Sequence, residues 1–453
     1  MSSKLNRREF VGMGAAVAAG TLLMSCTKQT PVKAWVPDLP PMLKTAPDGP
    51  ELKAGLIGCG GRGSGAVTQF LSAGNNLKVT ALGDVFKDKL DDVRKLLIEK
   101  KNNEVADEMC FVGFDAYQKV IDSGVDVIIL ATPPYFRPEH FRAAVNAKKN
   151  IFMEKPVAVD PVGVRSVMAT SKKAESLGLT VITGTQRRHE AKYIETLKQV
   201  AAGAIGDIVA ANCYWNMGQL WYRNHEAGWS DMEYMIRDWV NWCWLSGDHI
   251  VEQHIHNIDV INWFTDSHPV VAVGMGSRQR RVTGDQYDNF DVDFVYENGM
   301  HLHSMCRQIN GCVDNVSEWI VGTKGVSNCA GEIKDHNGKL IWKHELKKDP
   351  EGNDIDDINP YVQEHIDLLE SIRKGQPLNE SKRAAETNLT AIMGRISAYT
   401  GQLVRWVDLT NSESQTPWYG LQLSPTAEDF ETGTVTAPPE NVVAIPGKEA
   451  SQD

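Results

Sequence analysis

The chain has 453 residues, of which 42% are hydrophobic and 23% are charged, and its formal net charge at pH 7 is −11. This composition is ordinary for a globular protein, and the length favours two domains over one. The acidic balance argues against a nucleic-acid partner, which would require a basic surface. The 8 cysteines are scattered and form no CxxC pair, so neither a disulfide framework nor a zinc ribbon is expected.

Residues 1–30 have the pattern of an export signal. Twin arginines, Arg7 and Arg8, precede an apolar run over residues 11–24, as in a twin-arginine signal. The run is too short and too rich in alanine and glycine to be expected to span a membrane. We therefore expect export through the twin-arginine route to the periplasm. Because that route carries folded proteins, it suits an enzyme that binds its nucleotide before export.

The apolar run ends in Leu-Met-Ser-Cys, and its last residue is Cys26. This stretch is similar to a bacterial lipoprotein cleavage box, which predicts lipidation of Cys26 and a lipid anchor. Plain signal cleavage and a disordered tail are the alternatives. Residues 31–50 are rich in proline and predict an extended tether.

A glycine motif marks the start of the folded part. Leu56 and Ile57 form a short apolar run, which leads into G-x-G-x-x-G and a helix-like segment. This order is the fingerprint of a dinucleotide site. Gly58 allows the tight turn, Gly60 lets a pyrophosphate approach the backbone, and Gly63 lets the helix pack close to the strand. The helix start offers free N–H groups to the phosphates.

Asp84 ends the second expected strand, residues 77–83, and lies 21 residues after Gly63. A carboxylate at this place accepts hydrogen bonds from the adenosine ribose and repels a 2′-phosphate, which favours NAD over NADP. Its alternative role is to cap the helix that follows. Lys87 nearby leaves NADP as a minor option.

Apolar runs and helical patterns then alternate along the first domain. Residues 125–132 form a near-continuous apolar run, as in a strand buried on both faces of a parallel sheet. The loop after this strand holds Pro133, and ligands of such sheets bind at that edge. The remaining expected elements are helices over 138–147 and 161–176 and strands over 150–153 and 179–183. The fold class is therefore α/β, with an N-terminal doubly wound parallel sheet of the Rossmann type.

A second domain of the α+β class is expected after residue 187. Its strands predict a large, open, mostly antiparallel sheet, and they are expected over residues 206–215, 270–276, 291–296, 300–305, 317–321 and 339–342. Helices are expected over 193–202, 360–374 and 379–399. The expected division is a signal (1–30), a tether (31–50), an NAD-binding domain (51–187), a substrate and oligomerisation domain (188–378), a helix that returns to the first domain (379–422) and a tail (423–453).

An aromatic stretch over residues 215–244 contains Trp221 and Tyr222. Sugar rings stack on aromatic faces of this kind, so these two residues are candidates for substrate binding. Packing in the core or at a subunit interface is the alternative for any single ring.

The segment 247–264 is expected to be one helix with Glu252, His256 and Asp259 on one stripe, at positions i, i+4 and i+7. A metal site built from Glu252, His254 and His256 is the minor alternative, because on a helix His254 falls on another face. If the segment is extended or kinked, the three side chains converge. We expect no metal.

Three features occur in a fixed order: strand–GxGxxG–helix, an Ala-Thr-Pro-Pro loop, and a strand that ends in Glu-Lys-Pro. Together they resemble the Gfo/Idh/MocA family (glucose–fructose oxidoreductase and inositol dehydrogenase) over roughly residues 53–406. The resemblance implies that Lys155 is a catalytic-site residue, that His256 accepts a proton, and that the peptide before Pro156 is cis. Glu252 departs from the family's usual Asp and reaches one methylene further, which leaves its role open.

The site that we expect combines these residues. Catalytic residues are Lys155, His256 and Glu252. Cofactor-binding residues are Gly58, Gly60, Gly61, Arg62, Gly63, Asp84, Thr132, Pro133, Glu154 and Lys155. Substrate-binding residues are Arg187, Asp259, Trp221 and Tyr222, where Arg187 belongs to a loop that approaches cofactor and substrate in the family.

The expected function is that of an exported NAD(H)-dependent oxidoreductase acting on a hydroxyl or ketone of a sugar or glycoside, similar to a glycoside 3-dehydrogenase. NAD is expected to stay bound and to recycle, and the protein is expected to be a homo-oligomer, a dimer or a tetramer. One alternative is an NAD-dependent glycoside hydrolase that works by transient oxidation and elimination, since no paired-carboxylate glycosidase site is readable. The other is an inactive glycan-binding lipoprotein.

Overall fold

The computed structural model describes residues 37, 39–346, 348, 350, 358–411, 427–440 and 442–447, which belong to one compact unit that begins at Pro37. The expected export signal and Cys26 lie outside the described residues, as do most of the first half of the tether and part of the tail. Within the described part, no helix combines the length and the apolar character that crossing a membrane requires.

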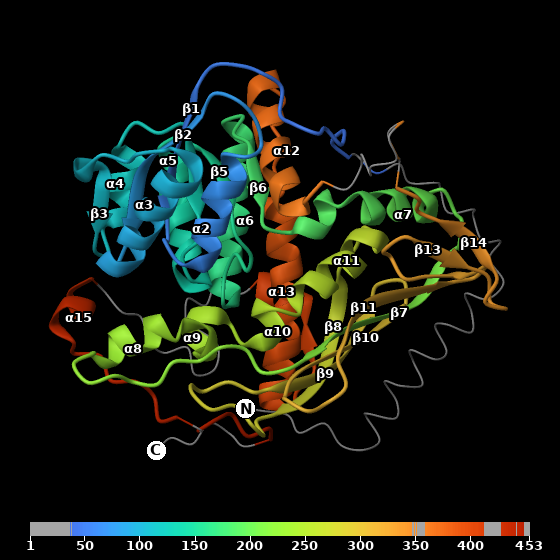
Figure 1. Cartoon of the computed structure of the whole chain (residues 1–453). Helices are drawn as coiled ribbons and strands as arrows, with labels where there is room; N and C mark the ends of the chain where they lie inside the picture. The colour runs from blue at the N-terminus through green and yellow to red at the C-terminus, as the bar shows by residue number, and fades with distance from the viewer. Residues whose placement is uncertain are drawn as a thin grey trace. The chain divides into compact units, whose positions relative to one another are not determined.

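Six strands of the described chain form a parallel sheet in the order β3-β2-β1-β4-β5-β6 (Figure 1). They are β1 (Leu52–Ile57), β2 (Leu77–Asp84), β3 (Cys110–Val112), β4 (Val127–Leu130), β5 (Asn150–Met153) and β6 (Val181–Thr183). The order of strands reverses between β1 and β4, and in open sheets of this kind ligands bind at the carboxyl ends of the strands beside the reversal. The expected doubly wound sheet is confirmed, although β3, with three residues, was missed.

The helices between these strands follow the expected alternation. They are α2 (Gly61–Phe70), α3 (Lys87–Lys101), η2 (Asp107–Met109), α4 (Ala116–Asp122), η3 (Pro134–Phe136), α5 (Arg137–Asn146), α6 (Pro161–Ser176) and η4 (Gln186–His189). β4 is buried along its whole length, because helices cover both faces of a doubly wound sheet.

The core of this first domain takes in a helix from the far end of the chain. α12 (Pro360–Lys374) contributes Ile366, Leu368 and Leu369 to the cluster that contains Leu56 and Phe152, and it packs against α2. The division expected from the sequence assigns residues 360–374 to the second domain. The apolar side of α12 instead completes the first domain, so the return to that domain begins before residue 379.

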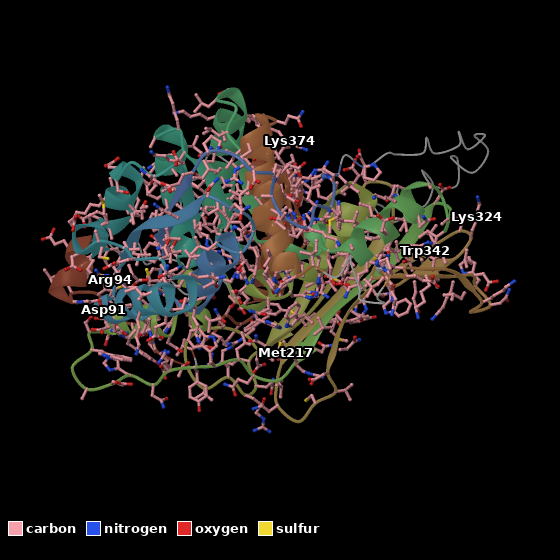
Figure 2. The ribbon with its side chains drawn as sticks, turned by 45° about the horizontal axis from the view of Figure 1, so that its top comes forward. Asp91, Arg94, Met217, Lys324, Trp342 and Lys374 are labelled. Carbon is pink, nitrogen blue, oxygen red and sulfur yellow. The ribbon has the colours of Figure 1, made fainter. Side chains whose placement is uncertain are left out.

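Nine strands of the described chain form a second sheet, in the order β14-β13-β12-β11-β7-β10-β9-β8-β15. They are β7 (Ile208–Met217), β8 (Pro269–Ser277), β9 (Asn289–Tyr296), β10 (His301–Gln308), β11 (Asn315–Gly322), β12 (Val326–Ser327), β13 (Glu332–Lys334), β14 (Leu340–Lys343) and β15 (Val404–Arg405). The neighbours pair antiparallel, except that β7 and β10 are parallel. Trp342 on β14 marks one edge of the sheet (Figure 2). The expected open, mostly antiparallel sheet is confirmed, with three short strands, β12, β13 and β15, added.

Helices cover one face of this sheet and connect it to the first domain. They are α7 (Ala191–Ala201), α8 (Asp231–Arg237), η5 (Trp239–Asn241), α9 (Cys243–Ser246), α10 (His249–Glu252), α11 (Ile255–Thr265), α13 (Ser381–Thr400), α14 (Trp406–Thr410) and α15 (Ala427–Thr432). α13 packs against both β8 and α6 and stands between the two sheets in Figure 1.

The segment that we expected to be one helix is broken in two. α10 ends at Glu252 and α11 begins at Ile255. The break turns His254 toward the sheet, where its Nε2 lies 2.7 Å from Ser304 Oγ. His256 faces a cavity instead. The single stripe of Glu252, His256 and Asp259 is therefore wrong as a description of the backbone.

Candidate active site

The glycine loop is shaped by close contacts on one side and open space on the other. Gly58 has φ of +96°, and a Cβ there would lie 2.6 Å from the backbone of Ala131 and Thr132. A Cβ at Gly63 would lie 2.0 Å from the carbonyl oxygen of Gly58. At Gly60 and Gly61 a Cβ would meet no described atom within 4 Å. Gly58 and Gly63 are thus required by the chain itself, whereas Gly60 and Gly61 leave room for a ligand.

α2 begins at this open side. Among the described residues no side chain caps its first turn, and that turn contains no acidic residue. Its N–H groups are therefore available to an anion, and the helix dipole favours negative charge there. The cradle fits the pyrophosphate of a dinucleotide.

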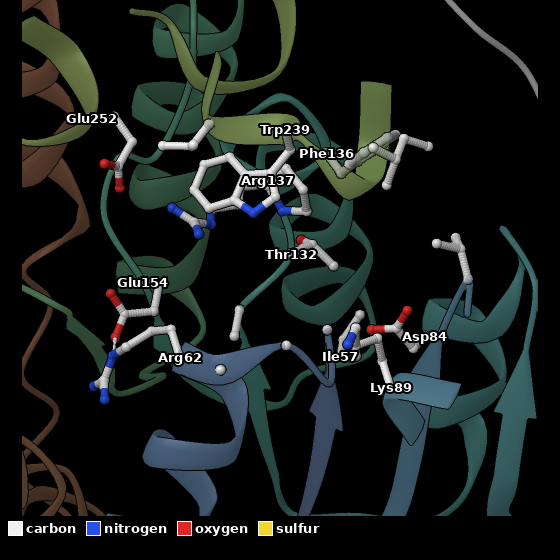
Figure 3. Close-up of a pocket in the computed structure, with 18 of the residues that line it drawn as sticks. Ile57, Arg62, Asp84, Lys89, Thr132, Phe136, Arg137, Glu154, Trp239 and Glu252 are labelled. Atoms are coloured by element: carbon white, nitrogen blue, oxygen red, sulfur yellow. Dashed lines mark hydrogen bonds and ion pairs between the residues drawn. The ribbon is translucent and has the colours of Figure 1, made fainter. Parts of the chain in front are cut away.

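A cavity of about 760 Å³ lies above the loop and is lined by both domains. Figure 3 shows Asp84 toward one end, Glu154 and Arg62 toward the other, and Trp239 and Glu252 across the cavity from the ends of the strands. The structure places these expected site residues on its walls: Gly58, Gly60, Gly61, Arg62, Asp84, Thr132, Pro133, Glu154, Lys155, Trp221, Glu252 and His256.

The end of the cavity next to Glu154 and Lys155 holds an ion pair. Lys155 follows β5, after Glu154, and its Nζ lies 2.9 Å from Glu252 Oε1 and also donates to the main-chain carbonyl of Glu252. Gln253 donates to the other carboxylate oxygen of Glu252. The peptide between Lys155 and Pro156 is cis, as the resemblance implies. The longer Glu252 side chain thus reaches Lys155 across the domain boundary and fixes its ammonium group.

His256 lies on the same wall of the cavity. Its ring stacks on Trp215 with 5.7 Å between ring centroids and 24° between the planes. Burial holds its pKa well below the usual value of 6.5, and the charges of Lys155 and Arg187 lower the pKa further. The imidazole is therefore neutral at pH 7 and free to accept a proton.

Arg62 links the glycine loop to this end. Its Nε pairs with the carboxylate of Glu154, and its Nη2 lies 3.6 Å from Glu364. Burial raises the pKa of Glu364 well above its usual value, and the neighbouring Glu154 raises it further. Glu154, which contacts the Arg62 guanidinium directly, is therefore the main partner of Arg62.

Asp84 stands at the other end of the cavity, where the adenosine of a dinucleotide belongs. Its two carboxylate oxygens accept hydrogen bonds from the backbone N–H groups of Cys59, at 2.6 Å, and Phe86, at 2.8 Å. Burial raises its pKa, although these two hydrogen bonds oppose the rise. The N-cap of α3 is Phe86, so Asp84 braces the glycine loop against the start of α3 and does not itself cap the helix.

The side of the cavity opposite the glycine loop is a roof, in which Trp221 is expected from the sequence and Arg237 and Trp239 are not. Arg237, at the end of α8, places two guanidinium nitrogens 3.1 Å from the carboxylate of Asp88 and stacks 3.9 Å from the ring centroid of Phe86. Trp239 follows it, and the Trp221 ring lies 6.4 Å from the Trp239 ring. Contacts between segments far apart in the sequence place this roof. The α8 segment carries no sequence motif that would have predicted it.

Four expected residues do not line the cavity as the described chain defines it: Gly63, Arg187, Tyr222 and Asp259. Asp259 makes a two-pronged ion pair with Arg188, 2.8 Å in each prong, and accepts from Thr387 at 2.9 Å. Its carboxylate is thus satisfied inside the protein, away from the cavity.

Arg187 lies behind the cavity wall. It pairs with Glu318 and stacks 5.7 Å from the Trp215 ring centroid. It therefore supports the ring on which His256 rests and does not face the cavity. Tyr222 is 43% exposed and lies outside the lining of the cavity.

Within the described ranges, no group of three His, Cys, Asp or Glu side chains is arranged to hold a metal.

These features define a dinucleotide-binding protein of the doubly wound class, with an acid–base group opposite its nucleotide loop. Residues 52–184 match the family model described as "Oxidoreductase family, NAD-binding Rossmann fold", and residues 193–327 match the "GFO/IDH/MocA C-terminal domain". The chain therefore belongs to the Gfo/Idh/MocA oxidoreductase family, and NAD is the cofactor of its first domain.

Curated relatives match over part of their length. One is scyllo-inositol 2-dehydrogenase (NAD(+)) of Bacillus subtilis, 22% identical over 54% of this chain and 63% of the relative. Another is 2,7-anhydro-N-acetylneuraminate hydratase of Escherichia coli, 23% identical over 49% of this chain and 52% of the relative. The chain thus spans about half the length of the curated relatives that it matches.

Solved structures share the fold. Scyllo-inositol dehydrogenase from Lactobacillus casei, with bound NAD(H) and scyllo-inositol, has a TM-score of 0.58 and 19% identity over 78% of this chain and 99% of that chain. Aldose–aldose oxidoreductase from Caulobacter crescentus has a TM-score of 0.58 and 17% identity over the same shares.

Proposed function

We propose that the protein is an NAD(H)-dependent oxidoreductase that acts on a hydroxyl or ketone of a carbohydrate or glycoside, in the manner of a glycoside 3-dehydrogenase. The observation that carries the proposal is the placement of Lys155 and His256 on one wall of the cavity whose floor is the glycine loop. The similarity to inositol dehydrogenases supports a polyhydroxylated substrate.

The chain's own groups divide the work of the reaction. NAD, when bound, supplies the acceptor for the hydride that leaves the substrate carbon. His256, neutral because it is buried, takes the hydroxyl proton, so that proton and hydride leave together and a carbonyl remains. The ammonium group of Lys155 donates to the substrate oxygen and stabilises the negative charge that develops there. Glu252 holds that ammonium group in place. Reduction of a ketone reverses each step.

We also propose that the protein retains its NAD between turnovers. The contacts of Arg237 with Asp88 and Phe86 support this, because they close the roof over the adenosine end of the cavity. An outer strap supports the roof in turn: Glu440 accepts from Tyr234 of α8, and the backbone N–H of Ala437 donates to Asp231 at 2.9 Å. A retained cofactor requires two half-reactions at one site, in which one substrate is oxidised and another is reduced.

Glycoside cleavage by transient oxidation, elimination and re-reduction is the second candidate. The relative named a hydratase favours it, since hydration involves no net oxidation. Oxidation at C3 would acidify the proton at C2, and loss of that proton would break the bond from C1 to the aglycone. Water would then add at C1 and a proton at C2, and the hydride would return to C3, so that the net reaction is hydrolysis.

Nitrophenyl glycosides separate the two candidates. The pure protein is incubated with a panel of them, with and without added NAD. A keto-sugar with its aglycone intact, together with absorbance at 340 nm, is the result expected for a dehydrogenase. Nitrophenol release without net NADH would replace the dehydrogenase with the glycosidase.

For the cellular setting, we propose twin-arginine export to the periplasm, a lipid anchor at Cys26 and a homo-oligomer. Arg7 and Arg8 support the first. The homo-oligomer is supported by exposed apolar side chains on the second sheet, such as Met275, which is 71% exposed, and Val273, which is 50% exposed. Cell fractionation of an Arg7→Lys/Arg8→Lys variant tests export, mass spectrometry of the mature N-terminus tests lipidation, and light scattering tests the oligomer.

A further inference from the structure

Arg137 is a buried cation on the wall of the cavity that the expected site did not include. It is the first residue of α5, directly after the loop that follows β4, and it is 3% exposed. Its Nη1 donates to the carbonyl of Pro156 at 2.5 Å, which anchors it beside the residue that follows Lys155. Figure 3 shows its guanidinium turned toward the side of the cavity where Glu252 lies.

The other two cations at this end already have carboxylate partners. Lys155 pairs with Glu252, and Arg62 pairs with Glu154. No carboxylate of the described chain lies within ion-pair distance of Arg137, and its Nε has no hydrogen-bond partner there. The guanidinium is thus held in place by one carbonyl group, and among the described residues no carboxylate contacts it.

Burial without a counter-charge is costly for a guanidinium. It lowers the pKa of Arg137 to about 10, even though Glu154 and Glu252 act in the opposite direction. The group is still a cation at pH 7, and a buried cation is retained where a partner compensates its desolvation. Because the side chain faces a cavity, a ligand can supply that partner.

The charge of the whole cavity points the same way. The described lining contains six cations and three carboxylates, in a chain whose net charge is −11. The cations are Arg62, Lys89, Arg137, Lys155, Arg223 and Arg237, and the carboxylates are Asp84, Glu154 and Glu252. Lys89 and Arg237 lie within ion-pair distance of Asp88, which is not part of the lining. At the Lys155 end, the cation without a carboxylate of the described chain at ion-pair distance is Arg137.

We propose that Arg137 binds a carboxylate on the substrate, so that the carbohydrate that this site takes is an acidic one, such as a uronate or a glycoside of a uronate. The inference rests on the proposed oxidoreductase function and specifies its substrate class. The planar guanidinium matches a carboxylate with two parallel hydrogen bonds, which fixes the orientation of the sugar. Arg137 is a specificity residue in this account, and the hydride and proton steps stay with NAD and His256.

Matched pairs of sugars test the proposal with the full-length protein: glucuronate against glucose, galacturonate against galactose, and the methyl glycosides of each. Turnover is followed at 340 nm, and binding is followed by the shift in Tm in the presence of NAD. We expect the acid of at least one pair to have the higher kcat/KM or the larger Tm shift. We expect Arg137→Gln to raise KM for that acid roughly 10- to 100-fold and to leave the neutral sugar and NAD binding unchanged.

Arg223→Gln is the matched control, since Arg223 also lines the cavity but is exposed and stacks over Trp221. It should leave the ratio of acid to neutral substrate unchanged. If Arg137→Gln does not fold, Arg137→Lys is the second variant. It keeps the positive charge but loses the two parallel N–H donors of the guanidinium, so it should reduce the ratio of kcat/KM for the acid to kcat/KM for the neutral sugar. The wild-type preference itself needs no variant.

Several results would overturn the assignment of Arg137. One is a wild-type protein that treats acid and neutral members alike in every pair. Another is an Arg137→Gln variant that weakens both members equally or loosens NAD, which would place Arg137 at the nucleotide. Turnover of neutral sugars alone would leave the oxidoreductase function standing and remove this inference. A protein that neither binds NAD nor acts on any sugar would remove the proposed function itself.

Discussion

The floor and the roof of the cavity are built in different ways. The floor comes from the ends of neighbouring parallel strands: Gly58 and Glu154 directly follow β1 and β5, and Thr132 lies two residues after the end of β4. The roof comes from segments of the second domain, with Arg237, Trp239 and His256 on three separate short elements. The floor depends on backbone geometry, whereas the roof depends on side-chain contacts between domains.

This difference separates binding from chemistry. Open space at Gly60 and Gly61 and the free end of α2 make the floor a place for the nucleotide. The roof and the adjoining wall supply the neutral His256, the Glu252 that holds Lys155, and the Arg237 contact that closes the cavity. Changes to the floor should therefore alter nucleotide binding, and changes on the roof side should alter turnover or retention.

His256→Asn should give the largest loss. It removes the proton acceptor but leaves the floor intact, so kcat should fall roughly 10²- to 10⁴-fold while NAD stays bound. Steady-state rates and the nucleotide released on denaturation measure the two effects. His303→Asn is the control, because His303 lies on β10 and is 45% exposed. Activity of His256→Asn within a few-fold of wild type would contradict the role given to the roof.

Two alanine substitutions in the floor should separate fold from ligand. Gly63→Ala places a methyl group 2.0 Å from a backbone oxygen, and overpacking of this kind should cost about 3 kcal/mol in the free energy of unfolding. Gly61→Ala meets no described atom, so stability without NAD should be unchanged while NAD affinity falls, because the methyl group takes up ligand space. Denaturant unfolding and calorimetry measure these quantities. Equal effects of the two substitutions on stability and on NAD affinity would contradict the distinction between Gly63, which the fold requires, and Gly61, which leaves room for the nucleotide.

Arg237→Ala should have a smaller effect, on retention. An exposed ion pair and a cation–π contact are each worth about 1 kcal/mol or less, so NAD should dissociate roughly 10-fold faster with kcat little changed. Arg94→Ala is the control, since Arg94, labelled in Figure 2, is on the same helix α3 as Asp88 but pairs with Asp107 and does not line the cavity. An unchanged dissociation rate would show that Arg237 does not hold the roof.

The smallest effect concerns pH. The pKa of His256 lies well below 6.5, so the imidazole stays neutral, and able to accept a proton, as the pH falls through 6.5. Between pH 7.5 and 6.0, kcat/KM should fall less than about twofold, whereas a histidine with the usual pKa would lose about fourfold. A pH profile that bends near 6.5 would contradict the buried, neutral state.

The sequence predicted the floor well, because its signals are local. Glycine spacing, an apolar strand and the residue after it are fixed by backbone geometry, so Gly58, Thr132 and Lys155 lie where their motifs indicate. The doubly wound order follows from the same alternation. β3 was missed because three residues carry too little pattern.

The roof could not be predicted in the same way. Helical periodicity put Glu252, His256 and Asp259 on one stripe, but the break at Gln253 and His254 separates them. A buried salt bridge then directs Asp259 away from the cavity and onto Arg188. Arg137 belongs to no sequence motif. It is a candidate for ligand binding because no carboxylate of the described structure pairs with it, and the sequence alone does not show this.

A single-turnover experiment tests the central claim most directly. The protein is purified without added cofactor, its bound nucleotide is quantified, and carbohydrates are mixed with it while absorbance at 340 nm is recorded. The account predicts bound NAD that is reduced by at least one carbohydrate, to no more than one NADH per chain, and no such signal from His256→Asn. A protein that binds no NAD, or one whose NAD no carbohydrate reduces, would contradict it.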